Sequence, residues 1–451
     1  MIRANRGDQT MKNIWKDAVF GVVVGDALGC PVQFEDRATV AGHPVTDMRE
    51  NGTFDLPVGS WTDDSSLTLA LLDSICKTGK LDLKHIMDNF ADWLENGAFT
   101  PYGKAFDIGR GTFRAIREYM HRGNPRQCGS YDERNNGNGS LMRIMPACLY
   151  CYEKGLDDKD AIKDIHQVGS LTHAHIRTNI ACGLYYFMVK AILSGNGMDF
   201  KARLQEGLDH GFAYYEKTLA DHEYLENYNR IRDLAVFANT PEEKIRSGGY
   251  VVDTLEAVLW SLINTDSFES ALLKAVNLGY DTDTVGAIAG GLAGLYYGCG
   301  GPLGIPCKWI DVIQKKEWIT ELCKTANARL SWHMEESKPC IAFSMDDAEK
   351  AYQHMDSVRV KDYGGTCGKN ILHTWDDGSR VLLRCKNCGG YILLQMSEFH
   401  GMEDDAYYAD YFPVSGPKEA QMINEQYDGE RIEKEFPRRW MIADGHPHWN
   451  K

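Results

Sequence analysis

Glycine recurs at every fourth position through an uncharged stretch in the second half of the chain. The stretch runs from Thr284 to Cys307, and the glycines that share the spacing are Gly286, Gly290, Gly294 and Gly298. This spacing places residues on one face of a helix, and a glycine face lets a neighbouring helix approach closely. The stretch breaks at GCGGPLGIPC after about four helical turns, too short for the roughly 30 Å of a bilayer. We therefore expect a buried helix of a soluble protein, with no membrane association.

The length of the chain favours two domains. With 451 residues it exceeds the size that one hydrophobic core usually reaches, so we expect one large and one smaller domain. It carries 64 acidic against 49 basic residues, a net charge of −15, which disfavours a broad nucleic-acid-binding surface. Its 13 cysteines show no paired framework, and its first residues lack the apolar core of a secretory signal. We expect a cytoplasmic protein, and a monomer.

Apolar residues recur every three or four positions through most of residues 11–335. This spacing is typical of amphipathic helices, and most of the periodic segments end at a glycine, a common helix terminator. No alternating pattern of strand length interrupts them. The sequence therefore predicts an all-α domain over residues 11–335.

The pattern changes after about residue 340. Two apolar runs flank the sequence DDGS at 376–379, and a third run follows them. Asp and Gly at such a position are typical of a hairpin turn between strands. We therefore expect a small C-terminal domain over residues 340–451 that is β-rich or α+β.

Two cysteines of this region, Cys385 and Cys388, form a C-x₂-C pair, and Cys367, His373 and His400 lie near them in sequence, which leaves the fourth ligand open. Four such ligands around one structural zinc ion can stabilise a domain that is too small for its own core. One alternative for this domain is therefore zinc-ribbon-like, with one bound Zn²⁺. The other is a metal-free β-hairpin with two buried thiols.

Two clusters of hydroxyl and carboxylate side chains precede apolar helical segments. The first consists of Thr62, Asp63 and Asp64, and the second of Asp281, Asp283 and Thr284. A single aspartate at such a position is often only a helix cap. Two clusters that each mix hydroxyl and carboxylate oxygens suit hard cations such as Mg²⁺, Mn²⁺ or Ca²⁺. We therefore expect a pair of metal ions that orients a substrate and activates a water molecule.

Seven segments occur in the order and with the approximate spacing of one known family. They are GDALGCPVQF, WTDDSS, FDIGRGT, NGNGSLMR, LTHAH, GYVVDTLEAVLW and GYDTDTVGAIAGGLAG. Over roughly residues 14–310 the chain resembles the ADP-ribosylglycohydrolase family, which includes dinitrogenase-reductase-activating glycohydrolase. The resemblance implies an all-α fold with a dinuclear Mg²⁺ or Mn²⁺ centre that hydrolyses the bond between ADP-ribose and an acceptor.

The resemblance also implies roles for particular residues. It places both oxygen clusters at the dinuclear centre, and within them it makes Asp63 and Asp283 catalytic. It implies that backbone amides of one loop meet the diphosphate, namely those of Gly137, Asn138, Gly139 and Ser140. Further substrate-contacting positions are matched by Asp26, Gln33, His173 and Tyr250. His173 matches a ribose-contacting position, and its alternative is a histidine satisfied inside a helix-packing face.

One residue departs from the family pattern. The position seven after Asp26, where the family often has a catalytic glutamate, is Gln33. Glutamine cannot act as a carboxylate base. Either the metals and aspartates activate water without it, or Glu35 or Asp107 takes its place, or activity is reduced. We favour Asp107 as a catalytic residue, because the aspartate of that motif lies in the cleft in the arginine-directed branch of the family.

The sequence thus predicts a glycosidase that removes ADP-ribose from an ADP-ribosylated protein or small molecule. The alternative is an ADP-ribose-binding module or structural relative with weak or no activity. All six metal-ligand positions are present, which favours the enzyme. The acceptor stays open between arginine, serine, a nucleobase and a free metabolite.

Overall fold

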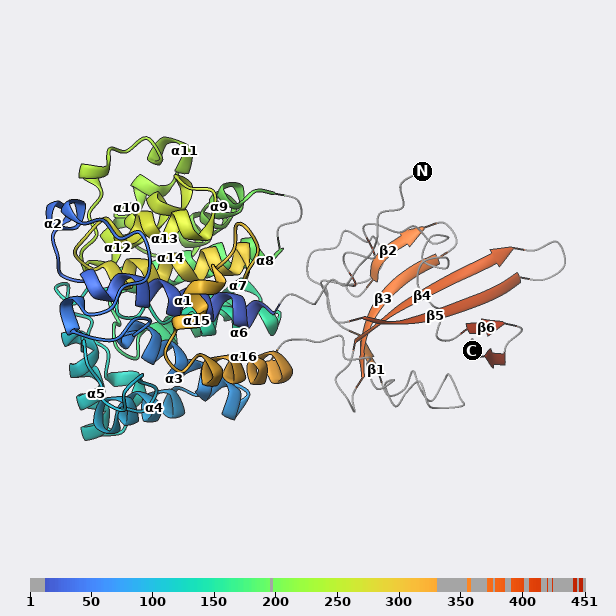
Figure 1. Ribbon diagram of the computed structural model, residues 1–451. Coiled ribbons are helices and arrows are strands. Elements are labelled where there is room, and N and C mark those ends of the chain that lie inside the picture. The colour runs from blue at the N-terminus through green and yellow to red at the C-terminus, as the bar shows by residue number, and fades with distance from the viewer. Residues whose placement is uncertain are drawn as a thin grey trace. The chain divides into compact units, whose positions relative to one another are not determined.

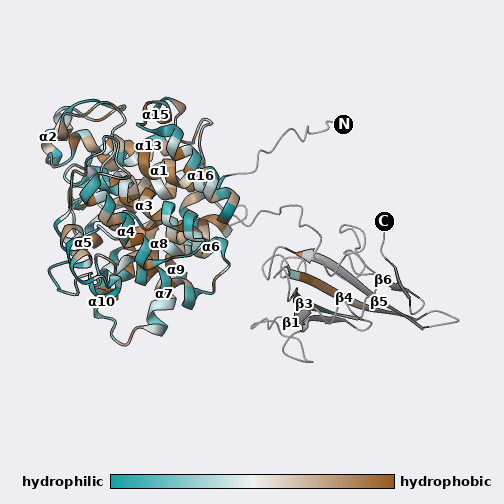
Figure 2. Cartoon of the chain, turned by 90° about the horizontal axis from the view of Figure 1, so that it is seen from below, coloured by the Kyte–Doolittle hydropathy of each residue, from teal (hydrophilic) through white to brown (hydrophobic). Residues whose placement is uncertain are grey.

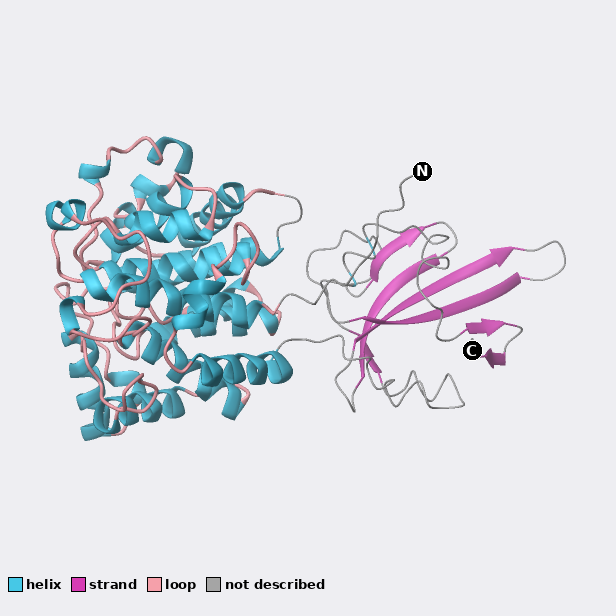
Figure 3. Cartoon of the chain, viewed as in Figure 1, coloured by secondary structure: helices cyan, strands magenta, loops and turns pink. Residues whose placement is uncertain are grey.

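The computed structural model describes residues 13–194, 198–330, 355–357, 371–375, 378–385, 391–400, 405–414, 420, 424, 441–443 and 446–448. The chain divides into two compact units, Met1–Ser331 and Trp332–Lys451. The described elements of the first unit are helices, and those of the second are mainly strands (Figure 1, Figure 3).

The first unit is helical throughout its described part. Its α-helices are α1 (Ile14–Gly29), α2 (Arg37–Gly42), α3 (Asp63–Thr78), α4 (Leu83–Asn96), α5 (Arg110–Arg122), α6 (Met145–Glu153), α7 (Asp158–Gly169), α8 (Ile176–Ser194), α9 (Phe200–Thr218), α10 (Glu223–Glu226), α11 (Leu234–Phe237), α12 (Val251–Ile263), α13 (Phe268–Val276), α14 (Thr282–Tyr297), α15 (Cys307–Val312) and α16 (Lys316–Leu330). Short 3-10 helices lie between them, namely η1 (Cys30–Val32), η2 (Gly52–Phe54), η3 (Pro125–Gln127), η4 (Asn229–Ile231) and η5 (Glu242–Lys244). No β-strand lies within residues 13–194 and 198–330, which confirms the predicted helical fold there.

Helix boundaries follow local sequence chemistry. Asp82 precedes α4, and its carboxylate accepts hydrogen bonds from the backbone N–H groups of Lys84 and His85, which would otherwise be unpaired in the first turn. Gly79 and Gly97 end α3 and α4 in the left-handed conformation that glycine adopts without strain. The predicted glycine terminators are therefore confirmed for these helices.

The glycine face of α14 packs directly on a second glycine face in α1. A Cβ atom built on Gly290 would lie 2.1 Å from the backbone oxygen of Gly21, and one built on Gly25 would lie 2.1 Å from the backbone oxygen of Gly286. The two backbones are thus in contact, as the spacing predicted. Gly298 does not take part, because it ends α14 with a φ of +78°.

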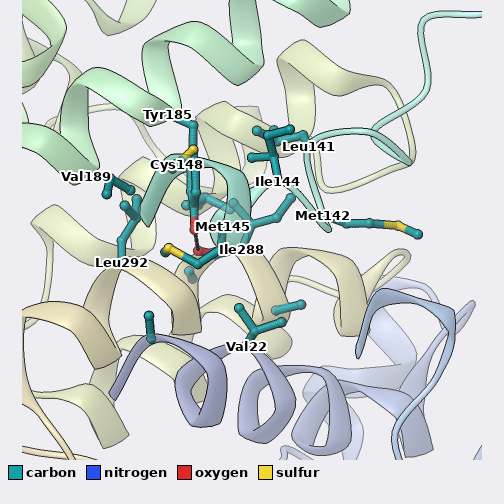
Figure 4. Packing of buried hydrophobic residues seen from close by; sticks show 14 of the residues in the cluster. Val22, Leu141, Met142, Ile144, Met145, Cys148, Tyr185, Val189, Ile288 and Leu292 are labelled. Carbon is teal, nitrogen blue, oxygen red and sulfur yellow. Dashed lines mark hydrogen bonds between the residues drawn. The ribbon is translucent and has the colours of Figure 1, made fainter. Parts of the chain in front are cut away.

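The helix pair lies inside the core of the first unit. Every residue of α14 from Thr282 to Leu295 is buried, and apolar segments are concentrated on the inner helices (Figure 2). Figure 4 shows side chains that pack at the pair: Val22 of α1 and Ile288 and Leu292 of α14, with Met145 of α6 and Tyr185 of α8. The Tyr185 hydroxyl donates a hydrogen bond to the backbone oxygen of Ile288 at 3.2 Å. None of the described helices has both the length and the apolar character needed to cross a membrane.

The described part of the second unit is β-rich. Its antiparallel five-stranded sheet has the order β1–β3–β4–β5, with β2 also paired to β3, and β6 pairs with β7. The strands are β1 (Met355–Ser357), β2 (Ile371–Trp375), β3 (Gly378–Cys385), β4 (Tyr391–His400), β5 (Asp405–Val414), β6 (Met441–Ala443) and β7 (His446–His448). β2 and β3 form the hairpin predicted around DDGS, and β4 is the third predicted run.

The strands give no support to the zinc-ribbon alternative. That alternative assumed a domain without its own core, whereas the sheet buries apolar side chains such as Leu382 and Leu393. Cys385 is buried at the end of β3. Cys367, Cys388 and the side chain of His373 lie outside the described part of the structure, so the structural zinc ion stays a prediction.

Gly290→Ala tests the contact of α1 and α14. Alanine normally favours a helix over glycine by about 1 kcal/mol, but here the added Cβ would lie 2.1 Å from a backbone oxygen. No side-chain rotation can relieve that contact, so we expect the free energy of unfolding to fall by about 3 kcal/mol. Urea unfolding followed by helical circular dichroism measures the change.

Gly42→Ala is the matched control, because a Cβ built on Gly42 meets nothing within 4 Å. This variant should differ from the wild type by less than about 0.5 kcal/mol. Equal stability of the two variants would contradict the backbone contact.

Candidate functional site

A cavity of about 690 Å³ opens in the first unit, a size typical of small-molecule sites. Its walls come from the end of η1, the N-terminal ends of α3, α5 and α14, and the loops that precede α5, α6 and α12. Nine of the predicted site residues line it, namely Gln33, Asp63, Asp107, Gly137, Asn138, Gly139, His173, Asp281 and Thr284. The fold therefore brings together residues that are up to 251 positions apart in sequence, from Gln33 to Thr284.

The other predicted site residues do not line this cavity. They are Asp26, Thr62, Asp64, Ser140, Asp283 and Tyr250. Ser140 is fully buried, and its hydroxyl lies 3.6 Å from the Cys182 thiol. Tyr250 forms an isolated antiparallel bridge with Gly137 and so supports, from outside the cavity, a loop that lines it.

The two predicted oxygen clusters meet through their threonine hydroxyls. Thr62 Oγ1 lies 3.2 Å from Asp283 Oδ2 and 3.4 Å from Asp64 Oδ2, and Thr284 Oγ1 lies 3.3 Å from Asp64 Oδ2. Thr62 Oγ1 also lies 3.0 Å from Asp26 Oδ1. A hydroxyl has one proton to donate, so it can satisfy only one of these three carboxylates at a time. Asp64 Oδ1 and Asp283 Oδ1 are buried and have no hydrogen-bond partner among the described residues.

This oxygen cluster brings carboxyl groups together in the buried interior. Burial, followed by the neighbouring carboxylates, raises the pKa of Asp64 and of Asp283 well above the usual value. Within the described part of the chain, no three His, Cys, Asp or Glu side chains are grouped so that they could hold a metal ion by themselves.

Asp26 holds α3 in place. Its carboxylate accepts hydrogen bonds from the backbone N–H and hydroxyl of Thr62, each at 3.0 Å. It also accepts from the backbone N–H of Ser65 at 3.0 Å and from the Ser65 hydroxyl at 2.6 Å. Burial raises its pKa to about 7, although these bonds oppose the rise. Because the carboxylate is occupied and lies outside the cavity wall, we assign Asp26 to positioning α3 instead of the predicted substrate contact.

Gln33 and Asp107 form a pair at the cavity. Gln33 Nε2 donates a hydrogen bond to Asp107 Oδ2 at 2.8 Å. Asp107 has a φ of +52°, an uncommon conformation for a residue with a side chain, of the kind that gathers at functional sites. Burial raises the pKa of Asp107, and the bond from Gln33 opposes that rise. Of the two candidate bases, Asp107 lines the cavity and Glu35 does not.

The loop at 137–140 is tied to two helices. Asn138 Nδ2 donates to Asp281 Oδ2 at 2.7 Å and to Thr254 Oγ1 at 3.0 Å. The Asn138 backbone N–H bonds to the backbone oxygen of Gly249 at 3.1 Å. That amide is therefore already used. It is not available to the diphosphate, contrary to the prediction.

Sequence reasoning missed three arginines on the cavity wall, Arg110, Arg114 and Arg134. Arg134 pairs with Asp132 at 3.2 Å. Arg110 and Arg114 lie one turn apart in α5, are exposed, and show no ion pair with any described residue. The sequence did contain a signal for Arg110 and Arg114. They come shortly after Asp107, and their own i, i+4 spacing places them on one face of a helix.

Comparisons with known proteins identify the family. Residues 8–337 match the family model described as ADP-ribosylglycohydrolase. ADP-ribosylarginine hydrolase Tri1 of Serratia proteamaculans (strain 568) is 31% identical over 313 residues, which cover 68% of this chain and 77% of that protein. ADP-ribosyl-[dinitrogen reductase] glycohydrolase of Rhodospirillum rubrum is 32% identical over 301 residues, which cover 66% of this chain and 90% of that protein.

A solved structure is also similar. The ADP-ribosylglycohydrolase-related protein complex shares 31% sequence identity with a TM-score of 0.55, over 71% of this chain and 98% of the other. The family model covers well over half of the chain, and the relatives exceed 30% identity. The chain therefore belongs to the ADP-ribosylglycohydrolase family.

Proposed function

We propose that this protein is a metal-dependent glycosidase that cleaves the bond between ADP-ribose and an acceptor, with residues 11–335 as the catalytic domain. The observation that carries the proposal is the buried oxygen cluster of Thr62, Asp64, Asp283 and Thr284, which adjoins the cavity through Thr284. The relatives named above act, by their names, on ADP-ribosylarginine and on ADP-ribosylated dinitrogen reductase.

The side chains of the oxygen cluster suit a hard cation such as Mg²⁺ or Mn²⁺, and we propose a pair of such ions. Asp64 Oδ1 and Asp283 Oδ1 are buried without a hydrogen-bond partner among the described residues, which is costly unless a cation meets them. Oxygen ligands of one Mg²⁺ ion lie about 3 Å apart, close to the hydroxyl-to-carboxylate distances of 3.2–3.4 Å. The proposed ligands are Thr62, Asp63, Asp64, Asp281, Asp283 and Thr284. Such ions lower the pKa of a bound water and orient the substrate.

Asp107 is the proposed general base. It lines the cavity, and the hydrogen bond from Gln33 fixes its carboxylate. A base here would take the proton of the water that attacks the anomeric carbon, where positive charge develops as the glycosidic bond breaks. The alternative, a binding module without turnover, rests on Gln33, which takes no proton. The position of Asp107 beside it favours catalysis.

The arginines suit the anionic part of the ligand. The chain has a net charge of −15, and Asp63, Asp107 and Asp281 all line the cavity. A diphosphate would meet repulsion there, but guanidinium groups bind phosphate oxygens well. We take ADP-ribosylarginine as the first substrate to test, with serine, nucleobase and small-molecule linkages as the alternatives.

Asp283→Asn tests the metal centre. The change keeps the shape but replaces an anionic oxygen by a neutral one, so we expect Mn²⁺ affinity and turnover to fall together. Isothermal titration with Mn²⁺ and release of ADP-ribose measure the two. EDTA should abolish turnover in the wild type, and Mg²⁺ or Mn²⁺ should restore it. Full turnover in a verified metal-free preparation would refute the mechanism.

Asp107→Asn tests the general base. We expect turnover to fall by about 10²- to 10⁴-fold, the range for a lost base. Binding of ADP-ribose should stay within about twofold. Mn²⁺ affinity should fall much less than in Asp283→Asn, because Asp107 is not among the proposed ligands and acts on them only through its charge. Steady-state kinetics and titration calorimetry separate the effects. Wild-type turnover in this variant would remove Asp107 from the mechanism.

The double variant Arg110→Gln, Arg114→Gln tests the anionic subsite. We expect a weaker affinity for ADP-ribose, by about tenfold, and a smaller decrease in affinity as salt rises. Fluorescence titration at two salt concentrations measures both. Arg117→Gln is the control, because Arg117 is exposed on the same helix and does not line the cavity. Equal affinity in both variants would contradict the assignment.

A further inference from the structure

His173 presents one ring nitrogen to the cavity. The residue is 5% exposed and lines the cavity wall. A Cβ built on Gly111 would lie 2.8 Å from His173 Nε2, and one built on Gly139 would lie 2.7 Å from Cε1. Both glycines line the cavity, so the absence of their side chains leaves room for the Nε2 edge of the ring. The protonation of Nε2 therefore decides what the cavity offers a ligand there.

The other ring nitrogen meets a buried threonine. The Thr172 hydroxyl oxygen lies 2.9 Å from His173 Nδ1, and Thr172 is 1% exposed. Either atom could in principle supply the proton of this bond, because both a hydroxyl and a neutral imidazole can donate or accept. The direction depends on the next partner of the hydroxyl.

That next partner is Arg143, a fully buried arginine. Its Nη2 donates to Thr172 Oγ1 at 2.8 Å, and both terminal nitrogens reach the backbone oxygen of Val168 at 3.3–3.4 Å. No described carboxylate pairs with it, and its guanidinium lies 4.9 Å from the centre of the Phe90 ring. A guanidinium can only donate, so Thr172 Oγ1 must accept from it.

The direction of the second bond follows. No other described group accepts the Thr172 hydroxyl proton, and a buried hydroxyl that does not donate loses free energy. The hydroxyl is satisfied if it donates to His173 Nδ1. The imidazole then carries its proton on Nε2. Burial, and then the charge of Arg143, lower the pKa of His173 to about 3, which keeps the ring neutral at ordinary pH.

We propose that Arg143 and Thr172 are positioning residues that fix the proton of His173 on Nε2, so that Nε2–H donates to an oxygen of ADP-ribose. The ligand in this inference rests on the proposed function, whereas the relay itself rests only on the side-chain contacts. A neutral donor of this kind orients a phosphate or ribose oxygen and takes up no proton. His173 is then a binding residue, and acid–base chemistry stays with Asp107.

The tautomer can be observed directly. Two-bond ¹H–¹⁵N NMR spectra of the full-length protein distinguish a protonated from an unprotonated ring nitrogen, and His173→Asn assigns the signal by its loss. We expect a protonated Nε2 and an unprotonated Nδ1 for His173 in the wild type. A protonated Nδ1 overturns the inference, whether or not the protein hydrolyses ADP-ribosyl bonds.

Thr172→Val and Thr172→Ser test the consequence for binding. Valine keeps the shape without the hydroxyl, and we expect the Kd for ADP-ribose to rise about 3- to 10-fold, as for one lost hydrogen bond. Serine keeps the hydroxyl and should stay within about twofold, with the wild-type NMR pattern. Thr265→Val is the control, because among the described residues the Thr265 hydroxyl bonds to backbone oxygens of α12 alone, and Thr265 does not line the cavity. Equal effects of valine and serine at position 172 would overturn the role of the hydroxyl.

Discussion

The contact between the backbones of α1 and α14 is the constraint on which the site depends. Glycines on both helices remove the side chains that would hold the axes apart, and the Cβ clearances of 2.1 Å leave no room for substitution. The same two helices carry Asp26 and Asp283, and the Thr282 hydroxyl bonds to the backbone oxygen of Gly29 at 2.8 Å. Close packing of the helices therefore fixes Asp26, and with it the start of α3, relative to Asp283.

The second constraint is electrostatic. Asp64 and Asp283 are almost completely buried; burial raises the pKa of both, and neighbouring carboxylates raise it further, Asp26 and Asp281 for Asp64, and Asp64 and Asp281 for Asp283. Two buried carboxylates this close cannot both ionise at low cost unless a positive charge lies between them. The proposed cations would supply that charge, and Asp26 contributes by fixing the N-terminal end of α3 to α1. The buried carboxylates that destabilise the metal-free protein would thus favour the binding of a metal ion.

The polar groups around the cavity differ in charge and in whether they donate or accept hydrogen bonds. Asp107 and Gln33 form a fixed pair on one wall, and Arg110 and Arg114 add positive charge. Buried Arg143 has no described carboxylate partner, and its contact with Thr172 sets the direction of the bond to His173. The Asp107–Gln33 pair and the His173 ring are therefore held before any ligand binds, which lowers the cost of ordering that part of the site.

The sequence by itself determined the helical first unit, the β-hairpin at DDGS and the two oxygen clusters, because helical periodicity, turn chemistry and ligand type are local properties. The sequence also identified the family, since the family motifs are short and occur in the expected order. Only the tertiary structure decided which residues meet. Asp26 turned from the predicted substrate contact to holding α3, the Asn138 amide proved to be occupied, and Arg110 and Arg114 joined the cavity wall. These outcomes depend on side-chain directions and on partners more than 30 positions away in sequence, such as Thr62 for Asp26 at 36, and no local pattern specifies such partners.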